Sequence, residues 1–357
     1  MIVQRLQAQR IRCLQTLDIQ PAPQINLIFG ENASGKSSLL ECLYLLSCGK
    51  SFRTKHLARV VCREETTFSL FSQIGSNHSL STAKLGLAYE NNRLNIKANG
   101  KAIKKTSELA TYLPLIILHQ ESYRILTEGP EIRRRFLNWG LFHVEQSFLS
   151  LWRRYSRTLK QRNLSLQQGG EVGIWDTALQ DAAMEIDRLR VSFSHELIDN
   201  FYQFVDVLLP ALEGISVSYY PGWERGREFS EVIRDSFARD KMLGYTAFGP
   251  HRTDLVFLHR GVALKELISR GQQKLLVCAL QLAQAKVYSR RTGKSCIILV
   301  DDVAAELDSA HQNVFWELIK ELNVQVFVTA TEALASLPNK MIQKRFHVKH
   351  GYVREVL

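Results

Sequence analysis

The chain has 357 residues, of which 45% are hydrophobic and 23% are charged, a composition typical of a globular protein of about two domains. No apolar run approaches the ~20 residues that span a bilayer, and the N-terminus lacks the apolar core of a signal peptide. These features argue against an integral membrane protein and predict a cytoplasmic location with no membrane partner.

The formal net charge is +11 and the pI is about 9.4. A basic surface favours a polyanionic partner, most commonly nucleic acid, although a solvated basic surface without a ligand is the alternative. The six cysteines form no C-x-x-C pair, and three of them lie within apolar runs: Cys42, Cys278 and Cys296. We therefore expect buried, reduced thiols and neither a zinc site nor a disulfide framework.

Residues 30–37 have the G-x-x-x-x-G-K-S spacing of a phosphate-binding loop. The apolar run 25–29 before the loop predicts a buried strand, and the apolar stretch 38–46 after it predicts a helix. This order points backbone N–H groups and a helix N-terminus at a phosphate. We expect Lys36 to reach the β- and γ-phosphates and the Ser37 hydroxyl to sit on Mg²⁺. A glycine-rich turn with an incidental lysine is the alternative.

Alternating apolar residues predict further strands in the first third of the chain. These strands are expected near residues 2–6, 68–74, 84–90 and 113–118.

The segment 128–210 changes character, because its apolar residues recur at helical spacing and its polar faces are crowded with charges. The spacing predicts helices over Glu131–Phe148, Leu149–Leu166 and Thr177–Leu209. Together they indicate an inserted helical arm. The alternation over Ile215–Tyr219 predicts a strand that returns the chain to the sheet, before a last mixed α/β region.

A second apolar run, 296–300, ends in Asp301 and Asp302. In phosphate-loop enzymes an acidic residue at such a strand end holds Mg²⁺. Asp301 is therefore the predicted metal ligand, acting through water, and Asp302 the group that orients or deprotonates an attacking water. A strand that ends in a polar turn is the alternative. Asp301 lies 265 residues after Lys36, far more than the ~30 of one compact βαβ unit. A large insert is therefore required.

Between these motifs, Ser269 to Lys274 form a polar turn that opens an apolar helix. A helix N-terminus with serine and glycine beside it is a second potential anion site. An ordinary N-cap is the alternative.

In combination, these motifs resemble the ATPase heads of the ABC and SMC class. In that class a Walker A loop (30–37), a signature motif (269–273), a Walker B strand (297–302) and a D-loop (306–308) follow in this order. More narrowly, the chain resembles the RecF family of bacterial recombination-mediator ATPases. That match is carried by residues 49–54, 128–137, 249–255 and 269–274.

The resemblance implies an α/β fold, an ABC-type P-loop NTPase head with an inserted helical arm domain. It implies a head built from 1–120 and 241–357 and a helical lobe over 121–240. It also implies ATP binding with slow hydrolysis, an ATP-dependent homodimer, and binding to double-stranded and to gapped or single-stranded DNA. RecO and RecR would be its mediators in loading RecA at gaps. By position, Gln120 resembles the Q-loop residue that senses Mg²⁺ and the γ-phosphate, and Thr329 or Thr331 stands at the switch position.

The predicted site residues fall into three groups. The catalytic residues are Asp302 and Gln120, and the metal-binding residues are Ser37, Asp301 and Gln120. The nucleotide-binding residues are Gly30, Glu31, Asn32, Ala33, Ser34, Gly35, Lys36, Ser37, Ser38, Ser269, Arg270, Gly271 and Gln272.

Three positions depart from the ABC pattern. Ala33 stands where glycine is frequent, and its Cβ should be tolerated only if the local φ is negative. Asp302 replaces the usual glutamate, and Arg270 adds a cation to the signature.

Two other functions compete with DNA repair. The nucleotide-binding subunit of an ABC transporter would carry the same motifs, but it needs neither the charge of +11 nor the helical insert. An SMC-like clamp would need a long coiled coil, for which 128–210 is too short.

Overall fold

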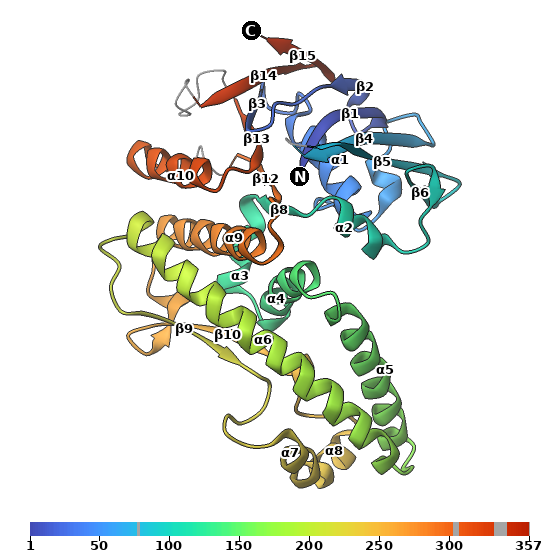
Figure 1. Ribbon diagram of the computed structural model, residues 1–357, viewed down its shortest axis with the longest axis vertical. Coiled ribbons are helices and arrows are strands. Elements are labelled where there is room, and N and C mark those ends of the chain that lie inside the picture. Colours follow the sequence, from blue (N-terminus) through green and yellow to red (C-terminus); the bar gives the residue numbers. More distant parts are fainter. Residues whose placement is uncertain (77–78, 303–306, 332–340, 357) are drawn as a thin grey trace. The chain divides into compact units, whose positions relative to one another are not determined.

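The computed structural model describes residues 1–76, 79–302, 307–331 and 341–356 (Figure 1). The chain forms two compact units, one of Met1–Ser122 with Tyr288–Leu357 and the other of Tyr123–Val287. Among the helices of the described residues, none is long and apolar enough to cross a bilayer. All six cysteines are free thiols, and the three expected in apolar runs are buried.

The first unit contains a six-stranded sheet in the order β15-β14-β3-β13-β12-β8. Its neighbours pair in parallel, except for the antiparallel edge strand β15. The predicted strands at 25–29 and 297–300 are interior members of this sheet, and both are largely buried, as strands covered on both faces must be. The strands are β3 (Ile25–Phe29), β8 (Leu115–Leu118), β12 (Ile297–Val300), β13 (Gln325–Ala330), β14 (Ile342–Lys349) and β15 (Tyr352–Val356).

A second, antiparallel sheet of this unit has the order β2-β1-β4-β5-β6-β7. Its strands confirm the alternations predicted near 2–6, 68–74 and 84–90. They are β1 (Ile2–Ile11), β2 (Leu14–Ile19), β4 (Phe68–Ser76), β5 (Ser79–Glu90), β6 (Arg93–Ala98) and β7 (Lys101–Ala102). The unit also holds the helices α1 (Lys36–Cys48), α2 (Leu109–Tyr112) and α10 (Ser309–Glu321).

Helix α1 is the centre of the hydrophobic core of this unit. Leu39, Leu43 and Leu46 are fully buried and belong to one cluster with residues of both sheets, such as Leu70 of β4 and Phe327 of β13. Because α1 packs on both sheets, the phosphate-binding loop that precedes it is held at a defined place.

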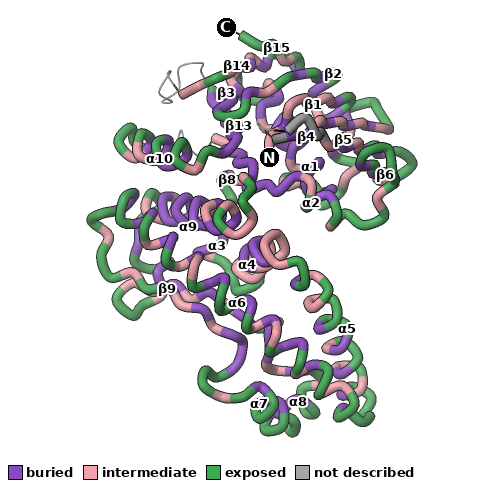
Figure 2. The backbone as a smooth tube through the Cα atoms, viewed as in Figure 1, coloured by how far each residue is buried: buried purple, intermediate pink, exposed green. Residues whose placement is uncertain are grey.

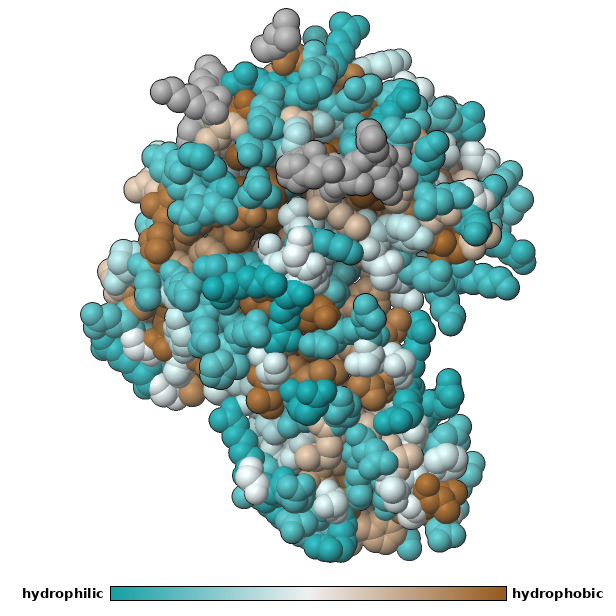
Figure 3. All heavy atoms as spheres, in the orientation of Figure 1, coloured by the Kyte–Doolittle hydropathy of each residue, from teal (hydrophilic) through white to brown (hydrophobic). Residues whose placement is uncertain are grey.

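The second unit is mainly helical. Helices α5 and α6 form an antiparallel hairpin with a short turn near Gly169, and buried and exposed stretches alternate along both (Figure 2). The three predicted arm helices are confirmed as α4, α5 and α6. The helices are α3 (Arg124–Thr127), α4 (Pro130–Val144), α5 (Phe148–Gln167), α6 (Gly173–Leu208), α7 (Phe229–Asp235), α8 (Phe237–Leu243) and α9 (Arg270–Thr292), whose last turn enters the first unit. Hydrophilic residues cover most of the face in Figure 3.

A buried ion pair joins α5 to α8. Arg162 and Asp240 are both fully buried, and the guanidinium Nη1 donates to the carboxylate at 2.7 Å and to the Thr246 hydroxyl at 2.8 Å. Arg162 Nε also donates to Asp176 of α6 at 2.7 Å. The Arg162 side chain therefore connects α5, α6 and α8.

The strand predicted at Ile215–Tyr219 exists, but it does not return to the sheet of the first unit, so that expectation was wrong. As β9 (Ile215–Tyr220) it pairs with β10 (Asp254–His259), which pairs with β11 (Val262–Ala263) in a separate three-stranded sheet. The burial pattern of β9 explains why it does not join the parallel sheet. Only alternate residues of β9 are buried, whereas the parallel sheet takes strands that are buried on both faces.

The predicted head included 241–357, whereas residues 241–287 belong to the second unit. Their partners explain the difference. β10 pairs with β9, and Gln284 of α9 donates its side-chain amide to the backbone carbonyl of Phe136 of α4 at 2.8 Å.

Candidate nucleotide site

The predicted ATPase motifs of the first unit follow neighbouring strands of one parallel sheet. In the strand register Leu27 of β3 lies beside Val328 of β13, which lies beside Val300 of β12, which lies beside Leu118 of β8. The residues that follow these positions therefore emerge at one edge of the sheet. This is the carboxyl edge, where open α/β sheets bind their ligands.

The phosphate-binding loop depends on two glycines with positive φ. Gly30 has a φ of 151° and Gly35 a φ of 120°. A Cβ on Gly30 would lie 2.2 Å from the carbonyl oxygen of Val348, so no side chain fits there. Ala33 also has a positive φ, of 63°, which corrects the expectation of a negative one. The left-handed conformation costs alanine about 1–2 kcal/mol. Ala33 itself is exposed, and the turn around it is closed by the Ser34 N–H, which donates to the carbonyl of Glu31 at 3.2 Å.

Lys36 is 5% exposed, and its ammonium donates to two carbonyls of the loop, Gly30 at 2.8 Å and Glu31 at 3.0 Å. The lysine is therefore held inside the curve of the loop, at the N-terminus of α1. The buried hydroxyl of Ser34 has no hydrogen-bond partner among the described residues. An unpaired hydroxyl, a cradle of two glycines and a buried ammonium fit the negative charge and acceptor oxygens of a phosphate.

The Walker B carboxylate of Asp301 contacts the phosphate-binding loop through the hydroxyl of Ser37. Ser37 Oγ donates to Asp301 Oδ1 at 3.0 Å. Thr329 is 2% exposed and stands between the two carboxylates. Its hydroxyl oxygen lies 2.9 Å from Asp301 Oδ1 and 3.2 Å from Asp302 Oδ1, and it accepts the Asp302 backbone N–H at 2.9 Å. One hydroxyl proton can be donated to only one carboxylate at a time.

Burial raises the pKa of the Asp301 carboxyl above its ordinary value, and hydrogen bonds from Thr329 and Ser37 oppose this rise. The negative charge of Asp302 raises the pKa further, while nearby His119 lowers it. A carboxylate with a neighbouring serine hydroxyl suits Mg²⁺, which binds through few protein oxygens together with phosphates and water. Ser37 and Asp301 are the residues that would hold it.

The other predicted residues of the first unit lie on the segments that follow β8, β12 and β13. Gln120 is exposed and begins a short 3₁₀ turn two residues after β8 ends. Thr331 is exposed, whereas Thr329 lies between the carboxylates. Of the predicted D-loop, Glu306 lies outside the described residues, and Asp308 caps α10 by accepting the N–H groups of Ala310 and His311.

The signature residues lie in the second unit, at the start of α9. Ser269 Oγ accepts the backbone N–H of Gln272 at 3.2 Å, and Gln272 Oε1 accepts the backbone N–H of Ser269 at 2.9 Å. This reciprocal pair is a capping box. The N-cap alternative is therefore realised. Arg270 and Gly271 form the first turn of the helix.

Two residues that touch the loop were missed from the sequence. Cys13, in the β1–β2 turn, lies with its Sγ 3.8 Å from the carbonyl oxygen of Ser34. Gly351, between β14 and β15, donates its N–H to the same carbonyl at 3.1 Å. No pattern near either residue signals this role, because each lies in the turn of a hairpin and only the tertiary fold brings that turn to the loop.

Comparison with known proteins agrees with this geometry. A family model described as RecF/RecN/SMC N terminal domain matches residues 2–352. The protein named DNA replication and repair protein RecF from Stutzerimonas stutzeri is 36% identical over 364 residues, covering 100% of this chain and 98% of the relative. The chain belongs to the RecF family. The protein of that name from Cellvibrio japonicus is 35% identical, with 99% of each chain covered.

Solved structures share the fold of this RecF-family chain. A structure of the recombination mediator protein RecF-ATP in the RecFOR pathway matches with a TM-score of 0.86 at 25% identity, covering 99% of this chain and 97% of that one. The corresponding RecF-ATPrS structure matches with a TM-score of 0.84 at 25% identity, covering 100% and 98%. An SMC head bound to the C-winged helix domain of ScpA has a TM-score of 0.60 at 14% identity and shares the fold alone. The predicted fold class, an α/β ABC-type head with a helical arm, is confirmed.

Proposed function

We propose that this RecF-family protein is an ATP-dependent DNA-binding protein of recombinational repair and replication restart. The observation that carries the proposal is the continuous contact from the phosphate-binding loop through Ser37 to Asp301 and Thr329. The family supports it as well, since its relatives are named DNA replication and repair proteins and its solved members include RecF-ATP. This evidence does not favour the alternative of an ABC transporter subunit.

Five residues of the head have distinct roles in the proposed ATP switch. Lys36 exchanges its two carbonyl acceptors for phosphate oxygens, and the loop amides hold the remaining charge. Ser37 and Asp301 hold Mg²⁺, which neutralises charge on the phosphates when it is bound. Asp302 orients and deprotonates the attacking water, and Gln120 senses the metal and the γ-phosphate. Hydrolysis is slow because ATP serves as a switch and not as the substrate of a fast reaction.

Measurements of ATP binding and of hydrolysis in three variants distinguish the binding roles from the role in hydrolysis. Lys36→Ala and Asp301→Asn should weaken ATP and Mg²⁺ binding, because both residues hold the ground-state complex. Asp302→Asn should leave binding near normal and slow hydrolysis, which traps an ATP-bound dimer. Equal loss of ATP affinity in all three variants, measured by calorimetry, would contradict the assignment.

ATP is proposed to drive a symmetric homodimer. The signature residues at 269–272 lie in the second unit, and in the proposed dimer they complete the ATP site of the partner subunit. A ligand contacted by both subunits stabilises the dimer by mass action.

Substitution at the signature tests the dimer with matched controls. Ser269→Arg should abolish ATP-driven dimerisation and keep ATP binding by the monomer, but it also removes the helix cap. Ser269→Asp keeps a capping oxygen while presenting an anion to the phosphates, so it should also remain monomeric. Ser269→Thr keeps both the cap and the hydroxyl and should dimerise. Sedimentation with ATP measures all three, and a dimer of Ser269→Asp as stable as the wild type would reject the shared site.

The dimer is proposed to act in the cytoplasm on double-stranded and gapped DNA, with RecO and RecR, to load RecA at single-strand gaps. A net charge of +11 per chain supports binding to DNA phosphates. Fluorescence titration of duplex and gapped DNA should show affinity that falls with salt, rises with ATP, and loses the ATP gain in Lys36→Ala. A flat salt response would refute DNA binding, and affinity indifferent to ATP would refute the switch.

A further inference from the structure

Helix α5 has a cationic face that no acidic residue of its own balances. The helix holds five cations and no aspartate or glutamate. Four of the cations are exposed and lie on one side of it, at helical spacings of three, four and seven residues: Arg153, Arg154, Arg157 and Lys160. The fifth, Arg162, is buried and paired with Asp240 and Asp176.

The neighbouring helix has the opposite character. α6 carries seven acidic residues against two arginines. Because α5 and α6 pack on each other as a hairpin, their exposed sides face away from the shared seam. Three acidic residues of α6 are exposed, namely Asp181, Asp199 and Asp206, so an approaching anion is attracted more to α5 than to α6.

The cations of α5 also differ from three other arginines of the second unit. Arg135, Arg188 and Arg227 each have a carboxylate partner within 2.6 Å. Within the described parts of the chain, Arg154, Arg157 and Lys160 make no ion pair and no side-chain hydrogen bond. Their charge is available to an external ligand.

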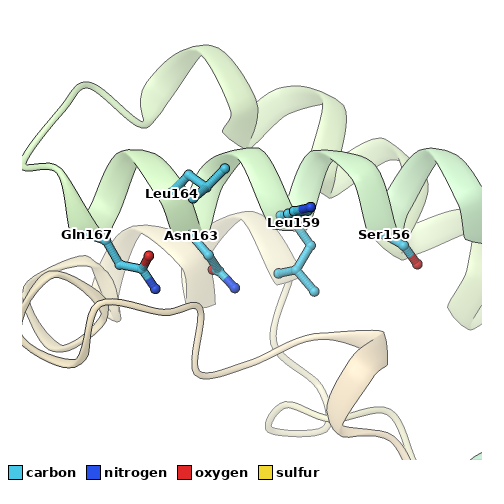
Figure 4. A pocket seen from close by; sticks show the side chains of 6 residues that line it. Ser156, Leu159, Asn163, Leu164 and Gln167 are labelled. Carbon is cyan, nitrogen blue, oxygen red and sulfur yellow. The ribbon is translucent and has the colours of Figure 1, made fainter.

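A small pocket of about 270 Å³ lies on the same helix (Figure 4). Four of its six lining residues are polar: Ser156, Lys160, Asn163 and Gln167, beside Leu159 and Leu164. The carbonyl oxygen of the Asn163 side chain accepts two hydrogen bonds from Thr246, which leaves its NH₂ group as a donor. An ammonium, two amides and a hydroxyl are donors suited to a phosphate oxygen.

We propose that this α5 face, defined by Arg153, Arg154, Arg157, Lys160 and the adjoining pocket, holds the sugar-phosphate backbone of DNA. The proposal rests on the proposed function and names its contact surface. At ~1.5 Å per residue, the cations from 153 to 160 span about 10 Å. Along the DNA axis, that length corresponds to roughly three phosphates of one strand, at about 3.4 Å of rise per phosphate. An acidic peptide would need an apolar anchor site, whereas this pocket is mostly polar.

The test compares two triple variants with the same change of net charge. The first is Arg154→Gln, Arg157→Gln and Lys160→Gln on the α5 face. The matched control is Arg135→Gln, Arg188→Gln and Arg227→Gln, which removes three paired cations of the same unit. Affinity of the full-length protein for a labelled duplex is measured with ATP at salt concentrations from about 50 to 400 mM. Over this range the screening of exposed charges increases strongly. Circular dichroism and ATP binding verify the fold.

The α5 variant should lower the magnitude of the log–log salt slope by about 2.7, at ~0.9 per lost phosphate contact, and lower affinity by up to ~500-fold at 0.1 M salt. The control should keep the wild-type slope. Equal losses in both variants would show that net charge alone governs binding, and wild-type affinity in the α5 variant would show that another surface, or another ligand of α5, is involved. Either result overturns the proposal.

The proposed function can fail separately, since a wild type that does not bind DNA would refute it whatever the α5 variant does. If the triple α5 variant does not fold, Arg157→Gln and Lys160→Gln as single variants carry the test, with a slope change of about 0.9 each.

Discussion

Thr329 offers the sharpest test of the site, because one buried hydroxyl joins both Walker B carboxylates. Thr329→Val keeps the shape of the side chain and removes the hydroxyl. The lost contacts are those to Asp301 at 2.9 Å, to Asp302 at 3.2 Å and from the Asp302 N–H at 2.9 Å. The part-buried N–H of Asp302 is then without this partner, which should lower the free energy of unfolding by about 1 kcal/mol.

The effect on ATP hydrolysis follows from the same contacts. Asp302 has a left-handed backbone with a φ of 56°, so it depends on its neighbours for its position. A hydrogen bond to a charged group is worth about 1.5–3 kcal/mol. If that stabilisation is realised when Asp302 acts on water, Thr329→Val should slow hydrolysis roughly 10- to 150-fold, at ~1.36 kcal/mol per tenfold. Binding of ATP should change much less, because Lys36 and Ser37 keep their places.

The assay is single-turnover hydrolysis beside equilibrium ATP binding. Thr329→Ser restores the hydroxyl and should recover most of the rate. Thr331→Val is the matched control, since Thr331 is exposed and makes no side-chain hydrogen bond within the described residues. Normal hydrolysis by Thr329→Val would refute the reasoning, and a slow Thr331→Val would move the switch role to that residue.

Three further predictions concern stability. Gly30→Ala should lower the free energy of unfolding by more than about 1 kcal/mol without nucleotide, because its Cβ would lie 2.2 Å from a carbonyl oxygen, whereas Gly173→Ala in the first turn of α6 meets no atom within 4 Å and should be neutral or slightly stabilising. Asp240→Asn leaves Arg162 with Asp176 as its remaining carboxylate partner and should cost about 3 kcal/mol in urea unfolding, the low end for a broken buried pair, unlike a surface Asp→Asn change. Burial lowers the pKa of His251 from 6.5 to about 4, so its stabilising contribution is complete above pH 6.5 and is lost as the pH falls towards 4. Between about pH 6.5 and 4, His251→Asn should reduce the pH-dependent loss of the free energy of unfolding by up to about 3 kcal/mol. An unchanged dependence of stability on pH would contradict the lowered pKa of His251.

The sequence predicts those parts of the site that are local. The spacing from Gly30 to Ser37 specifies the loop, and the apolar run before Asp301 specifies the strand that presents it. The contact between Thr329 and Asp301 is different, because 28 residues separate them and they meet only through the register of β13 with β12. A single sequence places both residues at strand ends but leaves open whether Thr329 or Thr331 faces the carboxylates.

The failed expectations have the same origin. The rule that Ala33 needs a negative φ is sound for an isolated residue, but the hydrogen-bonded turn of the loop overrides a preference of about 1–2 kcal/mol. The alternation at Ile215–Tyr219 predicted a strand correctly, yet its partner was not visible. β10 lies beyond two short helices, and only the half-buried pattern of β9 distinguishes a peripheral sheet from the parallel one.

The signature motif shows how two interpretations of one segment can both hold. The sequence allowed a second anion site or an ordinary N-cap at Ser269, and the hydroxyl accepts the Gln272 N–H as a cap. A cap uses one of the four N–H groups at a helix start, so the others remain suited to an anion. In the proposed dimer, however, ATP would compete for the same hydroxyl, and opening the cap would cost about 1 kcal/mol. The cap therefore holds Ser269 in place in the monomer and makes dimerisation slightly harder. Ser269→Gly removes both the cap and the hydroxyl that would contact ATP. A hydrogen bond to a charged phosphate is worth about 1.5–3 kcal/mol and the cap about 1 kcal/mol, so sedimentation should show a weaker ATP-driven dimer, while α9 stays folded because glycine costs a helix start only a few tenths of a kcal/mol.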